Sequence, residues 1–254
     1  MSAVGLDRRE HVVHVEGGHL LCVTDHPAGE PKATAIICHG LTGDRVGPQR
    51  LLTVLAEELV MFGFVSVRFD FRGSGDSSGV FAETTFAGMC DDLRSVAAWA
   101  EREYSTPALT LLGVSIGGVI PALCARELPG VTGVALISSD LVEDVVFPIH
   151  GNVPIRGGEF HLPDSFYRER EDLYPLTELY ESGIPAKLFY GARDEKLVEA
   201  ADRFAAVGLP THPARGQGHL FEDVDERGQL GRRIARFLCS TLPGENEPSE
   251  DTDE

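Results

Sequence analysis

Short apolar runs alternate along this chain with segments whose apolar residues recur at helical spacing. Runs rich in β-branched and apolar residues predict strands at 9–16, 19–25, 32–38, 64–69, 109–114, 131–138, 186–190 and 209–214. Helical spacing predicts helices at 49–62, 85–104, 116–128, 195–206 and 221–238. Strands that alternate with helices indicate an α/β fold with a mostly parallel eight-stranded sheet, and the first two strands indicate an antiparallel hairpin.

Residues 140–182 interrupt this alternation. They are rich in aromatic residues, Pro and Gly, and they show no clean period. Irregular stretches of this length inside a compact domain are usually functional. We therefore expect a single domain over residues 1–242 with a small inserted cap at about 140–182. The acidic residues 243–254 are expected to form a disordered tail.

Composition narrows the choice of partner. The formal charge of −18 argues against nucleic acid and against an anionic membrane surface, since both would be repelled. No apolar run approaches the length of a membrane span, and the first residues lack the apolar core of a secretory signal, so we expect a cytoplasmic protein. The cysteines occur singly and no His or carboxylate cluster has metal-ligand spacing, so we expect reduced thiols, no metal and no cofactor.

A candidate nucleophile follows the predicted strand 109–114, in Gly113-Val114-Ser115-Ile116-Gly117. A serine on a tight turn from strand to helix needs glycines two positions before and after it to avoid clashes. Its hydroxyl then stands clear of the sheet above a helix N-terminus. Chance produces this short pattern fairly often, so the pattern alone does not identify Ser115 as a nucleophile. Candidate partner residues in the neighbouring loops are needed as further evidence.

A serine hydroxyl needs a general base, and the base needs a carboxylate that orients it. Asp194 directly follows the strand 186–190, and His219 lies between the last strand and the last helix. Loops at the carboxyl ends of parallel strands share one edge of the sheet, so both can reach Ser115. Two alternatives stay open: Asp194 could serve only as the cap of the helix at 195–206, and Asp140 could be the acid.

An oxyanion hole needs two convergent N–H donors. The backbone of Ile116, directly after the serine, is one candidate, and the backbone of Leu41, in the loop after the strand 32–38, is the other. His39 in the same loop is interpreted as a structural histidine rather than a second base. Aromatic cap residues such as Phe147, Phe160 and Phe166 are candidate substrate contacts.

These motifs resemble those of a known family. With the serine turn, Asp194 and His219 in that order, the sequence resembles the serine α/β-hydrolases. The segments that carry the closer resemblance, to the cinnamoyl/feruloyl esterase-type branch, are His39-Gly40-Leu41-Thr42-Gly43-Asp44, Arg68-Phe69-Asp70-Phe71-Arg72-Gly73-Ser74-Gly75-Asp76-Ser77-Ser78-Gly79 and Gly218-His219-Leu220-Phe221. The resemblance covers about 12–238.

The resemblance implies an α/β-hydrolase fold with an insertion after the sixth core strand. It implies Ser115 as nucleophile, His219 as base and Asp194 as its orienting acid, with Leu41 and Ile116 as oxyanion donors. The chain departs from the branch beside the nucleophile, where His and Gln are often found and Val114 and Ile116 stand here. Phenol-contacting residues of the branch have no recognisable match.

The expected function is a serine carboxylic ester hydrolase that works through an acyl-enzyme. Its substrate would be a small-molecule ester with an apolar or aromatic group, as in feruloyl or cinnamoyl esterases. A thioesterase or acyltransferase, or a small peptidase, would use the same residues, and a non-catalytic binding protein on this fold is a further alternative. A homodimer is compatible with the sequence.

Overall fold

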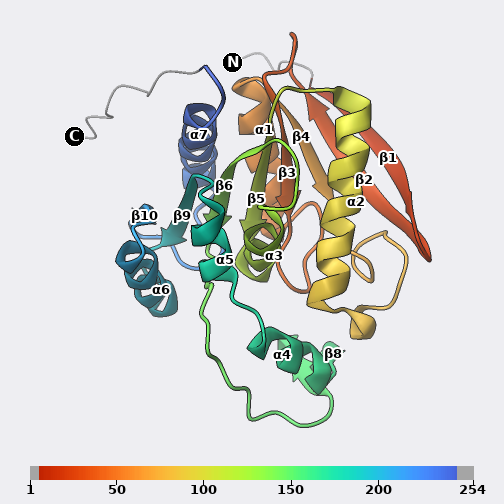
Figure 1. Ribbon diagram of the computed structural model, residues 1–254, viewed down its shortest axis with the longest axis vertical. Coiled ribbons are helices and arrows are strands. Elements are labelled where there is room, and N and C mark those ends of the chain that lie inside the picture. The colour runs from red at the N-terminus through yellow and green to blue at the C-terminus, as the bar shows by residue number, and fades with distance from the viewer. Residues whose placement is uncertain (1–5, 245–254) are drawn as a thin grey trace.

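A single eight-stranded sheet forms the centre of the computed structural model, which describes residues 6–244 (Figure 1). The strand order is β1-β2-β4-β3-β5-β6-β9-β10. The strands are β1 (Asp7–Val15), β2 (Gly18–His26), β3 (Ala33–Cys38), β4 (Phe64–Phe69), β5 (Leu109–Val114), β6 (Val131–Ile137), β9 (Ala186–Gly191) and β10 (Thr211–Ala214). Within this sheet only β1–β2 and β2–β4 pair antiparallel, so the predicted fold, including the N-terminal hairpin, is confirmed.

Helices cover both faces of the sheet (Figure 1). The helices that contribute to these layers are α1 (Leu51–Met61), α2 (Phe86–Tyr104), α3 (Val119–Cys124), α5 (Pro175–Ser182), α6 (Glu195–Ala206) and α7 (Val224–Ser240). One apolar core contains residues of α1 and α7, which pack against each other, and the other contains residues of α2, α3, α5 and α6. Every residue of β3 and β4 is buried, as expected for central strands of a sheet that is covered on both faces.

Residues 140–182 contain regular elements that the sequence pattern did not predict. A two-stranded hairpin, β7 (Val153–Ile155) and β8 (Phe160–Leu162), precedes the short helix α4 (Asp164–Glu171). In Figure 1 this hairpin and α4 lie beyond the end of the main sheet. The last element, α5, contacts α3 and belongs to the layer that covers the sheet. The part of the insertion that stands away from the sheet therefore ends before α5.

The insertion is fastened to the start of α2. The carboxylate of Glu169 accepts hydrogen bonds from the backbone N–H groups of Phe86 and Ala87, both at 2.8 Å. The ring of Phe166 stacks on that of Phe86, with centroids 4.6 Å apart. These contacts pair a negative charge with the free N–H groups of a helix N-terminus and bury an aromatic pair beside it.

Three helix boundaries differ from the prediction. The predicted helix 49–62 begins as α1 at Leu51, because Gln49 and Arg50 adopt left-handed backbone conformations. Regular α3 ends at Cys124 and turns follow, rather than a helix that continues to residue 128. The final helix begins at Val224 instead of residue 221, since Asp223 caps it.

Two further expectations concern the acidic tail and the absence of a membrane span. The predicted acidic tail lies, from residue 245 onward, outside the described residues. Among residues 6–244, no helix is both long enough and apolar enough to cross a membrane.

Candidate active site

Ser115 stands at the sharp turn between β5 and the short helical turn that leads into α3. Its φ angle is +53°, a left-handed conformation that side-chain-bearing residues seldom adopt. Val114 before it is still extended, and Gly118 after it is already helical. The chain therefore reverses direction within a few residues, and the serine lies at the carboxyl edge of the sheet.

The glycines around Ser115 are required by close packing. A Cβ on Gly113 would lie 2.4 Å from the carbonyl oxygen of Gly117, and one on Gly117 would lie 2.2 Å from the carbonyl oxygen of His39. Real Cβ atoms do not approach backbone oxygens this closely. The two glycines thus let β5, the turn and the loop after β3 meet at one point.

The side chain of His219 connects Ser115 to Asp194. His219 Nδ1 lies 2.7 Å from Asp194 Oδ2, and Nε2 lies 3.1 Å from Ser115 Oγ. A carboxylate can only accept, so Nδ1 carries the proton, and Nε2 of the neutral ring accepts from the serine hydroxyl. The structure brings together the three residues that the sequence singled out, from the loops that follow β5, β9 and β10.

Asp194 contacts His219 and also caps α6, the two roles that the sequence left as alternatives. Its Oδ2 faces His219, while its Oδ1 accepts the backbone N–H of Lys196 at 3.2 Å and caps α6. Asp140, the other candidate acid, instead pairs with Arg203 at 2.6 Å. The helix cap holds the Asp194 carboxylate in place for the histidine.

The two predicted oxyanion donors both line cavities that Ser115 also lines. Leu41 and Ser115 line one cavity, of about 190 Å³, and Ile116 and Ser115 line another, of about 330 Å³. Both cavities also touch His219. The Ser115–His219 pair therefore borders two cavities that a substrate can occupy.

His39 holds the loop that carries Leu41. Its Nδ1 donates to the carbonyl oxygen of Gly40 (2.8 Å), and its Nε2 accepts the backbone N–H of Phe71 (3.1 Å). Burial lowers the pKa of His39, which keeps the ring neutral, as these two bonds require. The interpretation of His39 as a structural residue agrees with this geometry.

The loop that carries His219 is held by Glu222, a residue that the sequence did not single out. Its carboxylate accepts the N–H groups of Gly218 (3.0 Å) and Leu220 (3.4 Å), one on each side of the histidine. These backbone bonds and the one from its own N–H lower the pKa of Glu222. Local sequence offered no signal for this role, because it depends on how the loop folds back.

Arg227 fastens the same loop to α1. Its buried guanidinium donates to the carbonyl oxygen of Phe221 (2.7 Å) and to the side-chain oxygen of Gln49 (2.8 Å). The backbone carbonyl of Gln49 accepts a third bond, at 2.5 Å. A long side chain from α7 thus ties the end of the histidine loop to the start of α1.

The three aromatic residues expected to contact substrate lie elsewhere. Phe166 is only 2% exposed and stacks on Phe86, so its ring belongs to the core. Phe160 packs edge-to-face on Phe81, and neither it nor Phe147 lines the cavities beside Ser115. The prediction fails for Phe166 because composition cannot distinguish an aromatic ring that anchors the cap from one that faces a ligand. Arg156, at the tip of the β7–β8 hairpin, is the residue of the insertion that lines the cavity on the Leu41 side.

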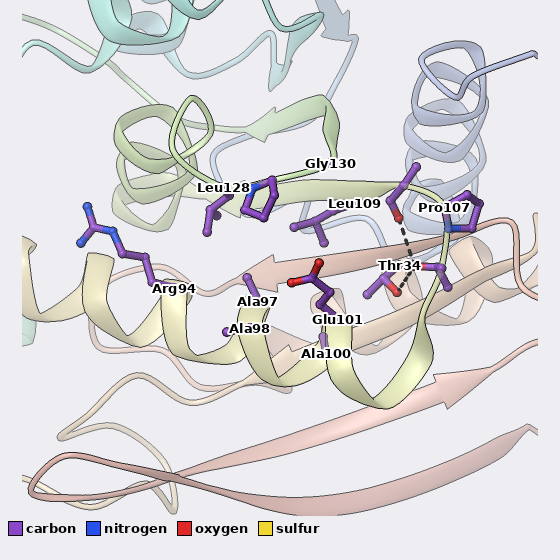
Figure 2. Close-up of a pocket in the computed structure, with 13 residues that line it drawn as sticks. Thr34, Arg94, Ala97, Ala98, Ala100, Glu101, Pro107, Leu109, Leu128 and Gly130 are labelled. Atoms are coloured by element: carbon purple, nitrogen blue, oxygen red, sulfur yellow. Dashed lines mark hydrogen bonds between the residues drawn. The ribbon is translucent and has the colours of Figure 1, made fainter.

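A further groove, of about 250 Å³, lies at the opposite edge of the sheet, where β3 and β5 begin (Figure 2). Figure 2 shows small apolar side chains of α2 along it, among them Ala97 and Ala98. Its arginine, Arg94, is already paired with Asp91 and Glu127. The groove brings no nucleophile and base together, so it is not the candidate active site. Within residues 6–244, no group of three or more His, Cys, Asp or Glu side chains could hold a metal ion.

Comparisons with known proteins agree with this fold. The sequence profile of the family described as "Serine aminopeptidase, S33" matches residues 29–149. A monoglyceride lipase from Rattus norvegicus is 32% identical over 130 residues, which are 50% of this chain and 42% of the lipase. The chain thus spans less than half the length of the curated relatives named here.

Similar solved structures cover nearly the whole chain. Est1E from Butyrivibrio proteoclasticus, solved with bound ferulic acid, has a TM-score of 0.80 at 19% identity and covers 91% of this chain and 99% of its own. The esterase domain of a Rhodothermus marinus protein has a TM-score of 0.70 at 23% identity and covers 90% of this chain and 96% of its own. At these identities the similarity establishes the α/β-hydrolase fold.

Proposed function

We propose that this chain, an α/β-hydrolase by its fold, is a serine hydrolase that cleaves carboxylic esters. The observation that carries the proposal is the continuous contact from Asp194 through His219 to Ser115, with distances of 2.7 and 3.1 Å. A serine strained on a tight turn, a histidine within hydrogen-bond distance of it and a carboxylate behind the histidine together meet the needs of nucleophilic acyl transfer.

In the proposed mechanism, Ser115 Oγ attacks the ester carbonyl while His219 Nε2 takes its proton. Asp194 stabilises the imidazolium that forms and keeps the ring in the required tautomer. The backbone N–H groups of Leu41 and Ile116 receive the negative charge that develops on the carbonyl oxygen. His219 then donates its proton to the leaving alcohol, and a water molecule, activated by the same base, releases the acid.

The relatives favour esters as the substrate class. The curated relatives include monoglyceride lipases, and the structural neighbours include an esterase solved with ferulic acid. Apolar side chains beside the reacting serine, those of Leu41, Ile116 and Leu220, fit an ester with an apolar or aromatic group. We propose a small-molecule ester of this kind.

Thioester or amide cleavage is the second candidate, because the same residues perform it and because the matching family profile is named for an aminopeptidase. A non-catalytic binding protein is disfavoured by the complete and connected set of Ser115, His219 and Asp194. Kinetic measurements that compare esters, thioesters and amides distinguish these substrate classes.

A panel of neutral 4-nitrophenyl esters of increasing acyl length, with matched thioesters and 4-nitroanilides, tests this proposal. We expect esters to be hydrolysed with the highest kcat/KM, accompanied by a burst of 4-nitrophenol as the acyl-enzyme accumulates. Anilide turnover that exceeds ester turnover would favour the peptidase alternative. A folded protein that hydrolyses none of them would contradict the proposal.

A further inference from the structure

Most positively charged side chains in this acidic protein make a hydrogen bond or an ion pair. The chain has 40 Asp and Glu residues against 22 Lys and Arg, so an unpaired cation stands out. Within the described residues, the Lys and Arg side chains that make neither a hydrogen bond nor an ion pair are Arg102, Arg156, Arg193, Lys196 and Arg215.

Two of these cations line cavities beside Ser115, and two others belong to the loops that carry Asp194 and His219. Arg156 lines the cavity on the Leu41 side, and Lys196 lines the cavity on the Ile116 side. Arg193 directly precedes Asp194 in the loop after β9, and Arg215 lies in the loop after β10 that leads to His219. Clustered charge at the mouth of a cleft concentrates ions of the opposite sign there, whatever the net charge of the protein.

Lys196 lines the cavity on the Ile116 side and makes no ion pair among the described residues. The cavity, of about 330 Å³, is also lined by the carboxylates of Asp140 and Asp194. Asp140 pairs with Arg203, Asp194 faces His219 and caps α6, and neither carboxylate forms an ion pair with the Lys196 ammonium group among the described residues. Glu199, one turn along α6, is not within ion-pair distance of Lys196 in the described structure.

Ser138, which lines the same cavity, has a strained backbone and an unused hydroxyl. It follows β6 with a φ of +48° and is 1% exposed. Its Oγ has no hydrogen-bond partner among the described residues. A buried polar group without a partner costs stability, and a ligand that supplies the missing hydrogen bond is one explanation for its presence.

We propose that the cavity on the Ile116 side is a subsite for an anionic group of the substrate, a carboxylate or a phosphate. Lys196 would pair with that group, and the hydroxyl of Ser138, after rotation about its Cα–Cβ bond, would donate to it. This inference rests on the proposed esterase function and names the substrate class more closely, as esters that carry a negative charge near the reacting carbonyl.

Two matched substrate pairs test the subsite and show on which side of the ester the charge lies. One pair is 4-nitrophenyl butyrate and 4-nitrophenyl hemisuccinate, in which the acyl group carries the charge. The other is the butyrate ester of 4-hydroxybenzamide and that of 4-hydroxybenzoate, in which the leaving group carries it. In one pair we expect the anionic ester to have a kcat/KM about tenfold higher. Added salt should reduce that preference.

Lys196→Glu is expected to abolish or invert the preference for the anionic ester. Arg102→Glu is the matched control, because Arg102 is equally unpaired and exposed but lies at the end of α2, away from Ser115. It changes the net charge by the same amount and should leave both the neutral rate and the preference unchanged. Ser138→Ala should reduce the preference about threefold without lowering the melting temperature, since it removes a hydroxyl that has no partner.

Two results would overturn the subsite, and a third would remove Ser138 from it. The wild-type protein could hydrolyse the neutral esters and prefer neither anionic one, which would leave the proposed function intact. Arg102→Glu could shift the preference as much as Lys196→Glu, which would show that the preference for the anionic ester depends only on the net charge of the protein. Ser138→Ala could lower the melting temperature and leave the preference unchanged, which would remove Ser138 from the subsite. If no ester is hydrolysed at all, the proposed function fails and the subsite fails with it.

Discussion

Replacing His219 by alanine is expected to lower kcat for a short neutral 4-nitrophenyl ester by about 10⁴–10⁶-fold. The variant retains Ser115 and the oxyanion donors but has no group within 3.1 Å that can take the serine proton. The serine hydroxyl is then left as a weak nucleophile. Steady-state kinetics on the purified variant, with circular dichroism to show that it is folded, measures this loss.

His219 is partly exposed, with 42% of its side-chain surface accessible, so its removal leaves no buried cavity and the fold should survive. His161, an exposed histidine in β8, is a suitable control, and His161→Ala should keep wild-type activity. A His219→Ala variant that retains activity within tenfold of wild type would remove His219 from the mechanism.

Asp194→Asn is expected to lower kcat by about 10⁴-fold. Asparagine caps helices as well as aspartate does, so the start of α6 is preserved and the change isolates the contact with His219. An amide that presents its NH₂ group to Nδ1 favours the tautomer with the proton on Nε2, which can no longer accept the proton of Ser115. Kinetics and thermal melting, measured together, separate this effect from lost stability.

Two further carboxylates serve as comparisons for Asp194. Asp223 caps α7 just as Asp194 caps α6, so Asp223→Asn should leave kcat unchanged. Asp140 lines the same cavity as Asp194 but pairs with Arg203, and Asp140→Asn should cost about threefold or less. A large loss in Asp140→Asn with little loss in Asp194→Asn would show that the wrong acid was chosen.

The fold and the meeting of Ser115, His219 and Asp194 could be predicted because they depend on local patterns and on one rule of topology. Apolar runs located the strands, and the ends of parallel strands share an edge of the sheet. The glycines beside Ser115 marked the turn, since only glycine avoids contact with the backbone at 2.2–2.4 Å. Local sequence placed each residue at the end of a strand, and the shared edge of the sheet brought the residues together.

Contacts that depend on the packing of particular side chains from different elements could not be predicted. Whether Asp140 or Asp194 reaches His219 depends on where Arg203 of α6 lies. The burial of Phe166 depends on Phe86, far away in the sequence. In each case the partner residue lies in another element, and neither the hydrophobic pattern nor the residue spacing predicts which residue it is.

The measurement that tests the account most directly is covalent labelling with a fluorophosphonate probe, followed by mass spectrometry of the labelled peptide. Such probes react with serines that a neighbouring base has activated. We predict one adduct, on Ser115, which is absent in Ser115→Ala and greatly reduced in His219→Ala. A folded wild-type protein that stays unlabelled, or that carries its adduct on another residue, would contradict the assignment of Ser115 as the nucleophile.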